Sequence, residues 1–83
     1  MALRLNWRHS FPGSRWDYRT NIEGLPLAFA RVYYSVAYTT PETRWIWVAA
    51  DEEGRLGEGA AADREAACNA AESFLLGSRN VDT

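Results

Sequence analysis

Hydrophobic and polar residues alternate along much of the first 60 residues, and short turn-forming segments interrupt the alternation. A period of two is typical of strands with one buried face, whereas a run that is apolar on both faces indicates a central strand. Residues 45–50, Trp-Ile-Trp-Val-Ala-Ala, form such a run. We therefore expect four to five strands, drawn from residues 2–9, 15–22, 28–38, 45–50 and 55–60.

From residue 63 onward the apolar positions follow the period of a helix. Asp63 is the expected N-cap and Gly77 the expected residue after the last turn. Arg64, Glu65, Glu72 and Ser73 are expected to lie mostly off the apolar stripe. The stripe itself comprises Ala66, Ala67, Ala70, Ala71, Phe74 and Leu75. The pattern predicts an α+β fold, a four- to five-stranded antiparallel sheet packed on one C-terminal α-helix.

Eighty-three residues favour one domain over 1–77, followed by a frayed tail at 78–83. The single cysteine, Cys68, excludes an internal disulfide, so stability must come from packing, with self-association as a further source. No apolar run approaches the roughly 18 residues of a membrane span, and the N-terminus lacks a signal-peptide pattern. We expect a cytoplasmic protein that does not engage membranes.

Charge is distributed unevenly, although the net charge is only −2. Residues 1–44 hold six arginines against three acids, and residues 45–83 hold three arginines against eight acids. Every basic residue is arginine, which forks and stacks at interfaces in ways that lysine does not. The N-terminal half therefore favours a basic surface and the C-terminal half an acidic one.

Candidate catalytic and metal-binding residues are few. His9 is the only histidine, so the chain has no two-histidine metal site and no histidine relay. Cys68 is expected to pack as a small buried side chain. The glycines of residues 54–59 lack the Gly-Lys-Ser/Thr of a phosphate-binding loop. We predict a protein that is not an enzyme, with no cofactor and no metal.

The C-terminal quarter resembles part of a known family. Leu56-Gly-Glu-Gly, Glu65-Ala-Ala and Asn69-Ala-Ala are similar to the last strand and final helix of a double-stranded-RNA-binding domain. In that family a lysine-rich helix N-terminus contacts phosphates across a groove. The matching positions here carry no lysine, and the family's first helix has no counterpart. They read Ala62, Asp63, Arg64 and Cys68. The resemblance therefore implies helix packing and not RNA binding.

A second resemblance covers nearly the whole chain. It rests on Leu5-Asn-Trp7, Trp16, Trp45-Ile-Trp47, Gly57 and the helical run from Ala66 to Glu72. This layout is similar to that of short phage and mobile-element proteins built as a sheet backed by one alanine-rich helix. Some small phage proteins of this build are anti-CRISPR inhibitors. The resemblance implies a phage-encoded inhibitor of a host CRISPR-Cas or other nucleoprotein complex.

One helix covers only one face of a sheet, so the other face must meet solvent, a partner or a second copy. Arginine with aromatic side chains is the composition enriched in interface hot spots. We therefore predict a protein-binding module, with two candidate surfaces. The first is a basic sheet face formed by Arg4, Arg8, Arg15, Arg19, Arg31 and Tyr33, with Phe29 beside them. The second is the acidic turn formed by Asp51, Glu52 and Glu53, for which a solvated turn is the simpler interpretation.

Two alternatives remain open from the sequence. Nucleic acid could bind the basic face, with rings stacking on bases and arginines neutralising phosphates. The negative net charge and the eight acids of the C-terminal half oppose this hypothesis. The second alternative is a homodimer or other self-associating accessory protein that uses the open sheet face.

Overall fold

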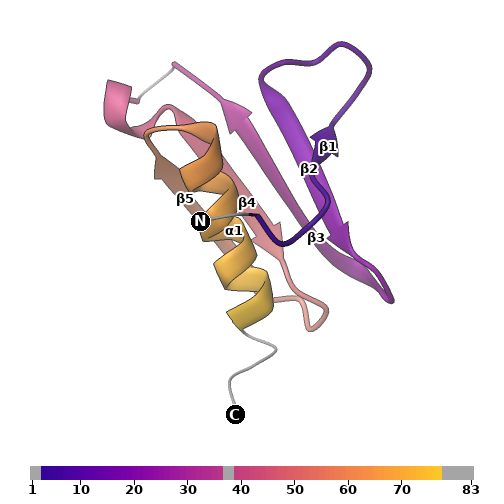
Figure 1. The fold of residues 1–83 in the computed structure, drawn as a ribbon. Coiled ribbons are helices and arrows are strands. Elements are labelled where there is room, and N and C mark those ends of the chain that lie inside the picture. The colour runs from indigo at the N-terminus through magenta and orange to yellow at the C-terminus, as the bar shows by residue number, and fades with distance from the viewer. Residues whose placement is uncertain (1–2, 37–38, 78–83) are drawn as a thin grey trace.

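The computed structural model describes residues 3–36 and 39–77, which form one antiparallel sheet and one α-helix. The five strands lie in the sheet in chain order, and each pairs antiparallel with its neighbour (Figure 1). The predicted α+β fold is confirmed, and the predicted tail at 78–83 lies outside the described residues. The elements are β1 (Arg8–His9), β2 (Asp17–Ile22), β3 (Leu25–Tyr34), η1 (Pro41–Thr43), β4 (Trp45–Ala50), β5 (Leu56–Ala61) and α1 (Arg64–Gly77).

Tight turns join the strands where the sequence places glycine. Gly24 and Gly54 adopt φ values of 84° and 89°, a backbone conformation that disfavours other residues. Strand β4 has the predicted bounds and lies between β3 and β5, as its two apolar faces indicate. Strand β3 ends at Tyr34 and not at residue 38, and residues 37–38 lie outside the described residues.

Helix α1 packs on one face of the sheet, against β3, β4 and β5 (Figure 1). Its start is capped as predicted, because the Ala66 amide donates to Asp63 Oδ1 over 2.8 Å. Gly77 is the last helical residue and does not follow the helix. The predicted stripe is wrong at Ala66, which is exposed, and at Glu72, which is buried. The buried positions of the helix are Ala67, Cys68, Ala71, Glu72 and Leu75.

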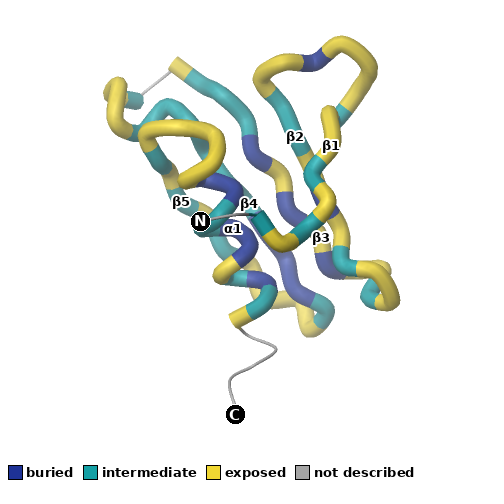
Figure 2. Tube along the Cα trace, in the orientation of Figure 1, coloured by how far each residue is buried: buried dark blue, intermediate teal, exposed yellow. Residues whose placement is uncertain are grey.

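Small side chains fill the space between sheet and helix, where the buried residues gather (Figure 2). Six of the nine buried apolar residues in the described part of the chain are alanine. All of them except Ala50, which lies on the other sheet face, pack between the sheet and α1, so the helix backbone can approach the sheet closely. Partly buried rings complete the packing around them, among them Trp7, Trp47 and Phe74. The central core is therefore thin, and the aromatic rings at its margin supply much of the apolar contact.

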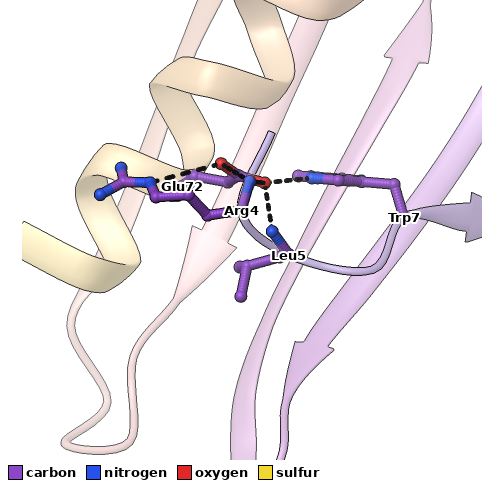
Figure 3. A network of polar contacts seen from close by, with 4 residues as sticks. All are labelled: Arg4, Leu5, Trp7 and Glu72. Carbon is purple, nitrogen blue, oxygen red and sulfur yellow. Dashed lines mark hydrogen bonds and ion pairs between the residues drawn. The ribbon is translucent and has the colours of Figure 1, made fainter. Parts of the chain in front are cut away.

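The N-terminal arm, residues 3–7, is the main departure from the predicted secondary structure. A strand was expected over residues 2–9, but only Arg8 and His9 pair with β2. The expected alternation is present, since Leu3, Leu5 and Trp7 are half-buried. Residues of the arm, however, bond to the helix: the carboxylate of Glu72 accepts the backbone amides that a sheet ladder would otherwise have used (Figure 3).

Glu72 is fully buried and anchors the N-terminal arm to α1. The amide of Arg4 lies 2.9 Å from Oε1, and Oε2 accepts from the Leu5 amide and the Trp7 indole Nε1, both at 2.8 Å (Figure 3). The Arg4 guanidinium adds an ion pair in which Nε lies 3.9 Å from Oε1. Buried carboxylates are stable when such donors satisfy them, so Glu72 is a structural residue.

Candidate protein-binding face

Within the described residues, 3–36 and 39–77, no helix covers the sheet face opposite α1, and we call it the open face. The strand register places its side chains in transverse rows that cross the sheet. The middle row runs through one residue of each strand: Arg8, Arg19, Arg31, Val48 and Glu58. The rows on either side contain Asp17, Tyr33, Ile46 and Ala60, and Asn21, Phe29, Ala50 and Leu56.

Three arginines are direct cross-strand neighbours in the middle row. Arg8 pairs with Arg19, and Arg19 pairs with Arg31. Like charges directly opposite each other destabilise a sheet, so this arrangement is unfavourable for the isolated chain. Arg8 donates to Asn21 Oδ1 over 2.7 Å, which orients the guanidinium and leaves its charge in place.

Asp17 neutralises one of the three arginines. Arg31 Nε and Nη2 lie 2.9 and 2.5 Å from the two carboxylate oxygens of Asp17, a bidentate ion pair. The hydrogen bond from Arg31 is the main cause that lowers the pKa of Asp17 from its ordinary value, and partial burial opposes it. Arg31 also lies over the ring of Tyr33, 4.7 Å from its centroid. Arg31 is therefore held flat on the face.

Apolar side chains occupy the rest of the open face. Phe29 is 44% exposed, and Leu56 at the edge strand is 81% exposed. Between them, Ile46 and Val48 of the central strand are half-buried although no helix covers them. Leu27, just before this part of β3, is 67% exposed. A sheet face with arginine and tyrosine beside exposed leucine and phenylalanine has the mixed composition of protein interfaces.

The structure places only part of the predicted basic set on the open face. Arg8, Arg19, Arg31 and Tyr33 lie there, as does Phe29. The outward placement predicted for Arg4 and Arg15 is wrong. Arg4 contacts Glu72 on the helix side, because its segment is not a strand. Arg15 precedes β2 and borders a hollow with Trp45 and the start of α1.

Glu58 is a residue of the open face that the sequence analysis did not single out. It lies opposite Val48 in the edge strand β5. Counting forward from the turn at Gly54 would place it there, but the glycines on either side of Glu58 hide the alternation of this strand. With Glu58 and Asp17 against three arginines, the strand residues of the open face carry a net charge of +1.

The acidic turn is largely used by the fold itself. Asp51 is buried, and its Oδ1 accepts the amides of Glu53 and Arg55 at 3.0 and 2.8 Å. Glu52 Oε2 accepts the amide of Leu27 at 2.8 Å, which ties the turn to the start of β3. Glu53 is the exposed member of the three. This turn is therefore a weaker candidate for partner binding than the open face.

A cluster of aromatic rings on the helix side of the sheet is the alternative to the open face as a binding surface. Trp16, Tyr34 and Trp45 lie with centroids 4.9 to 5.9 Å apart, and Trp16 is 55% exposed. Trp16 lies on the same side of the sheet as α1 but stays largely open to solvent. The rings contact one another, and Trp16 and Trp45 border the hollow that also adjoins Arg15 and the start of α1. Arg64, at the helix start, bonds to the Tyr18 hydroxyl over 3.0 Å.

The two candidate reactive residues, His9 and Cys68, pack against other side chains of the fold. The ring centroids of His9 and Tyr18 lie 4.9 Å apart, and Cys68 is a residue of α1 that is buried against the sheet. Within residues 3–36 and 39–77, no group of three or more His, Cys, Asp or Glu side chains could hold a metal ion. None of the helices in this part of the chain has the length and apolar character needed to cross a membrane.

Cys68 is expected to be unreactive in the folded protein. Burial is the main cause that raises the pKa of its thiol to about 12, and Glu72 and Glu65 add to the effect. Because the thiolate is the reactive form, a disulfide reagent at pH 8 should modify native Cys68 at least about 100-fold more slowly than the urea-unfolded chain. Absorbance of the released thiol follows the reaction. Equal rates in the two states would show that α1 does not protect this residue.

Comparison with known proteins identifies no relative: no family model, no curated protein and no solved structure matches the chain.

Proposed function

We propose that this protein is a non-enzymatic protein-binding module that recognises its partner through the open face. The observation that carries the proposal is the row of three cross-strand arginines next to exposed apolar side chains on an uncovered sheet. The row destabilises the free chain and becomes favourable when a partner supplies carboxylates. Arginine and aromatic residues also account for a large share of binding energy at protein interfaces.

A protein partner fits this face better than nucleic acid does. Binding to a polyanion depends on how many phosphates the arginines neutralise, and the strand residues here offer a net charge of only +1. Asp17 already neutralises Arg31, and Glu58 would repel a phosphate backbone at the β5 edge. The apolar side chains Phe29, Ile46 and Val48 are instead suited to contacts with a protein surface.

The non-enzymatic part of the proposal rests on the surroundings of the two candidate reactive groups. His9 stacks near Tyr18, and the Cys68 thiol is buried with a raised pKa. Neither has the partner geometry of a nucleophile with its general base.

Substitutions on the open face should abolish partner capture without unfolding the chain. We expect immobilised Arg19→Glu to retain a specific protein partner at least about 10-fold less than wild type, because it reverses the charge at the centre of the arginine row. Arg15→Glu is the matched control, since Arg15 is exposed and lies off this face. The test compares proteins retained from bacterial lysate, and purified CRISPR effector complexes provide a direct probe of the partner class suggested by the sequence.

Two results would contradict the proposal. One is equal retention of the same partner by Arg19→Glu and wild type. The other is the absence of any retained protein together with binding of labelled RNA or DNA at moderate salt, which would favour nucleic acid.

A further inference from the structure

We propose that the partner received by the open face is a second copy of this chain, packed face to face about a two-fold axis. The axis runs parallel to the strands and lies between β3 and β4. This inference rests on the proposed function, because it requires that the open face binds protein. A symmetric dimer uses the same patch on both copies, so the patch must complement itself.

The charges of the middle row provide that complementarity. Across the sheet from β1 to β5 the row reads basic at Arg8, Arg19 and Arg31, apolar at Val48 and acidic at Glu58, with Arg31 already paired to Asp17. A two-fold axis between β3 and β4 reverses the strand order, so that β2 of one copy lies over β5 of the other. Arg19 then faces the second copy's Glu58, and this ion pair occurs twice in the dimer. Opposite charges at such positions favour one register over others.

Other two-fold axes through this row are less favourable. An axis along β3 brings Arg8 over the second copy's Glu58 but sets Arg31 against its own copy. An axis between β2 and β3 sets Arg19 against Arg31, and an axis perpendicular to the strands sets Arg19 against Arg19. Like charges in contact across an interface are strongly unfavourable. An axis along β4 brings Glu58 to Arg31, which Asp17 already neutralises, and leaves Arg19 uncovered. The axis between β3 and β4 is the arrangement that places Arg19 near an acid.

Side-chain sizes on the neighbouring rows match the same axis. Phe29 of β3 comes to lie over Ala50 of the second copy's β4, a large ring over a small residue. Tyr33 lies over Ile46, and the aliphatic part of Arg31 over Val48. Alternation of large and small side chains is what allows two sheets to interdigitate at a separation of about 10 Å.

The area of the face is sufficient for a specific dimer. Four overlapping strands spaced about 4.8 Å apart, each about six residues long, span a patch of about 19 by 20 Å. Side-chain relief makes the accessible surface larger than this projection, so two copies bury on the order of 1,000 Å², about the minimum for a specific interface and typical of a weak dimer. The dimer would also cover Phe29 and Val48 and supply burial that the alanine-rich core lacks.

Charge reversal tests both the dimer and its register. We expect sedimentation equilibrium of the full chain to show dimers, and we expect Arg19→Glu or Glu58→Arg alone to weaken dimerisation at least about 10-fold. The two substitutions in one chain should restore the wild-type dissociation constant to within about threefold, because they exchange the two charges and the facing side chains are again opposite in sign. Arg15→Glu and Glu65→Arg are matched controls away from the face, and circular dichroism confirms folding of each variant.

The outcomes separate this inference from the proposed function. A wild-type chain that remains monomeric at hundreds of micromolar would overturn the dimer. A double variant no better than the single variants would overturn it equally. In either case, capture of another protein that is lost in Arg19→Glu and kept in Arg15→Glu would leave the proposed function standing.

Discussion

Replacement of Glu72 by leucine should lower the free energy of unfolding by about 3 kcal/mol or more, a large part of the stability of a domain of this size. Glu72 accepts the amides of Arg4 and Leu5 and the indole of Trp7 (Figure 3). Leucine fills a similar volume but accepts no hydrogen bond. Either these donors stay buried without partners, or the N-terminal arm detaches and the packing of Leu5 and Trp7 on the core is lost.

Urea unfolding followed by tryptophan fluorescence measures this effect. Ser73→Leu is the matched control, because Ser73 is the exposed neighbour of Glu72 on the same helix and should change stability by less than about 0.5 kcal/mol. The loss of stability in Glu72→Gln should fall between those of Glu72→Leu and Ser73→Leu. The amide oxygen of glutamine still accepts a hydrogen bond, but its NH₂ group faces a donor and leaves that donor without a partner. A Glu72→Leu variant as stable as wild type would show that the arm is not anchored through this carboxylate.

Alanine at Gly59 should cost about 1 to 3 kcal/mol of stability, because the position lies directly beneath a tryptophan ring. A Cβ atom there would sit 2.5 Å from Trp47 Nε1 and 2.9 Å from Cε2. Trp47 cannot move freely, since it packs against both parts of the core and its ring lies 6.1 Å from that of Phe74. The strand or the ring must therefore shift.

Gly77→Ala is the control for this second prediction. Its φ is not positive, and among the described residues no atom outside its chain neighbours and the nearby helix backbone lies within 4 Å of an added Cβ. Alanine at this helix end should be neutral or slightly stabilising, through a lower entropy of the unfolded chain. Thermal unfolding of the two variants provides the comparison. Equal midpoints for Gly59→Ala and Gly77→Ala would contradict the close approach of β5 and Trp47.

The sequence pattern predicts β2, β3 and α1 well because each has a clear period of two or of 3.6 residues. It predicts β4 from a run that is apolar on both faces, and β5 from the turn at Gly54 that precedes it. It fails at the N-terminal arm for a physical reason. Alternation records that every second side chain is buried, but it does not show what pairs with the backbone. The acceptor is Glu72, more than 60 residues away in the chain, whose charge made it look like a surface residue. Its spacing of four from Cys68 is the signal that places it on the buried stripe.

The sequence predicts that one sheet face carries arginine and aromatic side chains, but it does not correctly predict all the residues on that face. Alternation correctly separates Arg19, Arg31 and Tyr33 from the side chains under the helix. It does not show where a strand begins, so Arg4 and Arg15 were assigned to a face that their segments never join. Glu58 was missed because a glycine-rich strand shows little alternation. These three differences turn a strongly basic face into a nearly neutral one with opposite charges at its two edges.

Phe29 and Trp16 allow the most direct test of the open face, because they are exposed rings of comparable accessibility on opposite sides of the sheet. Phe29 lies on the open face at 44% exposure, and Trp16 lies on the helix side at 55%. The decisive measurement is the association affinity of Phe29→Ala and Trp16→Ala, for the second copy and for any captured protein. If the open face is the recognition surface, Phe29→Ala loses at least about 10-fold in affinity and Trp16→Ala stays near wild type. The reverse order would contradict it and move recognition to the aromatic cluster beside α1.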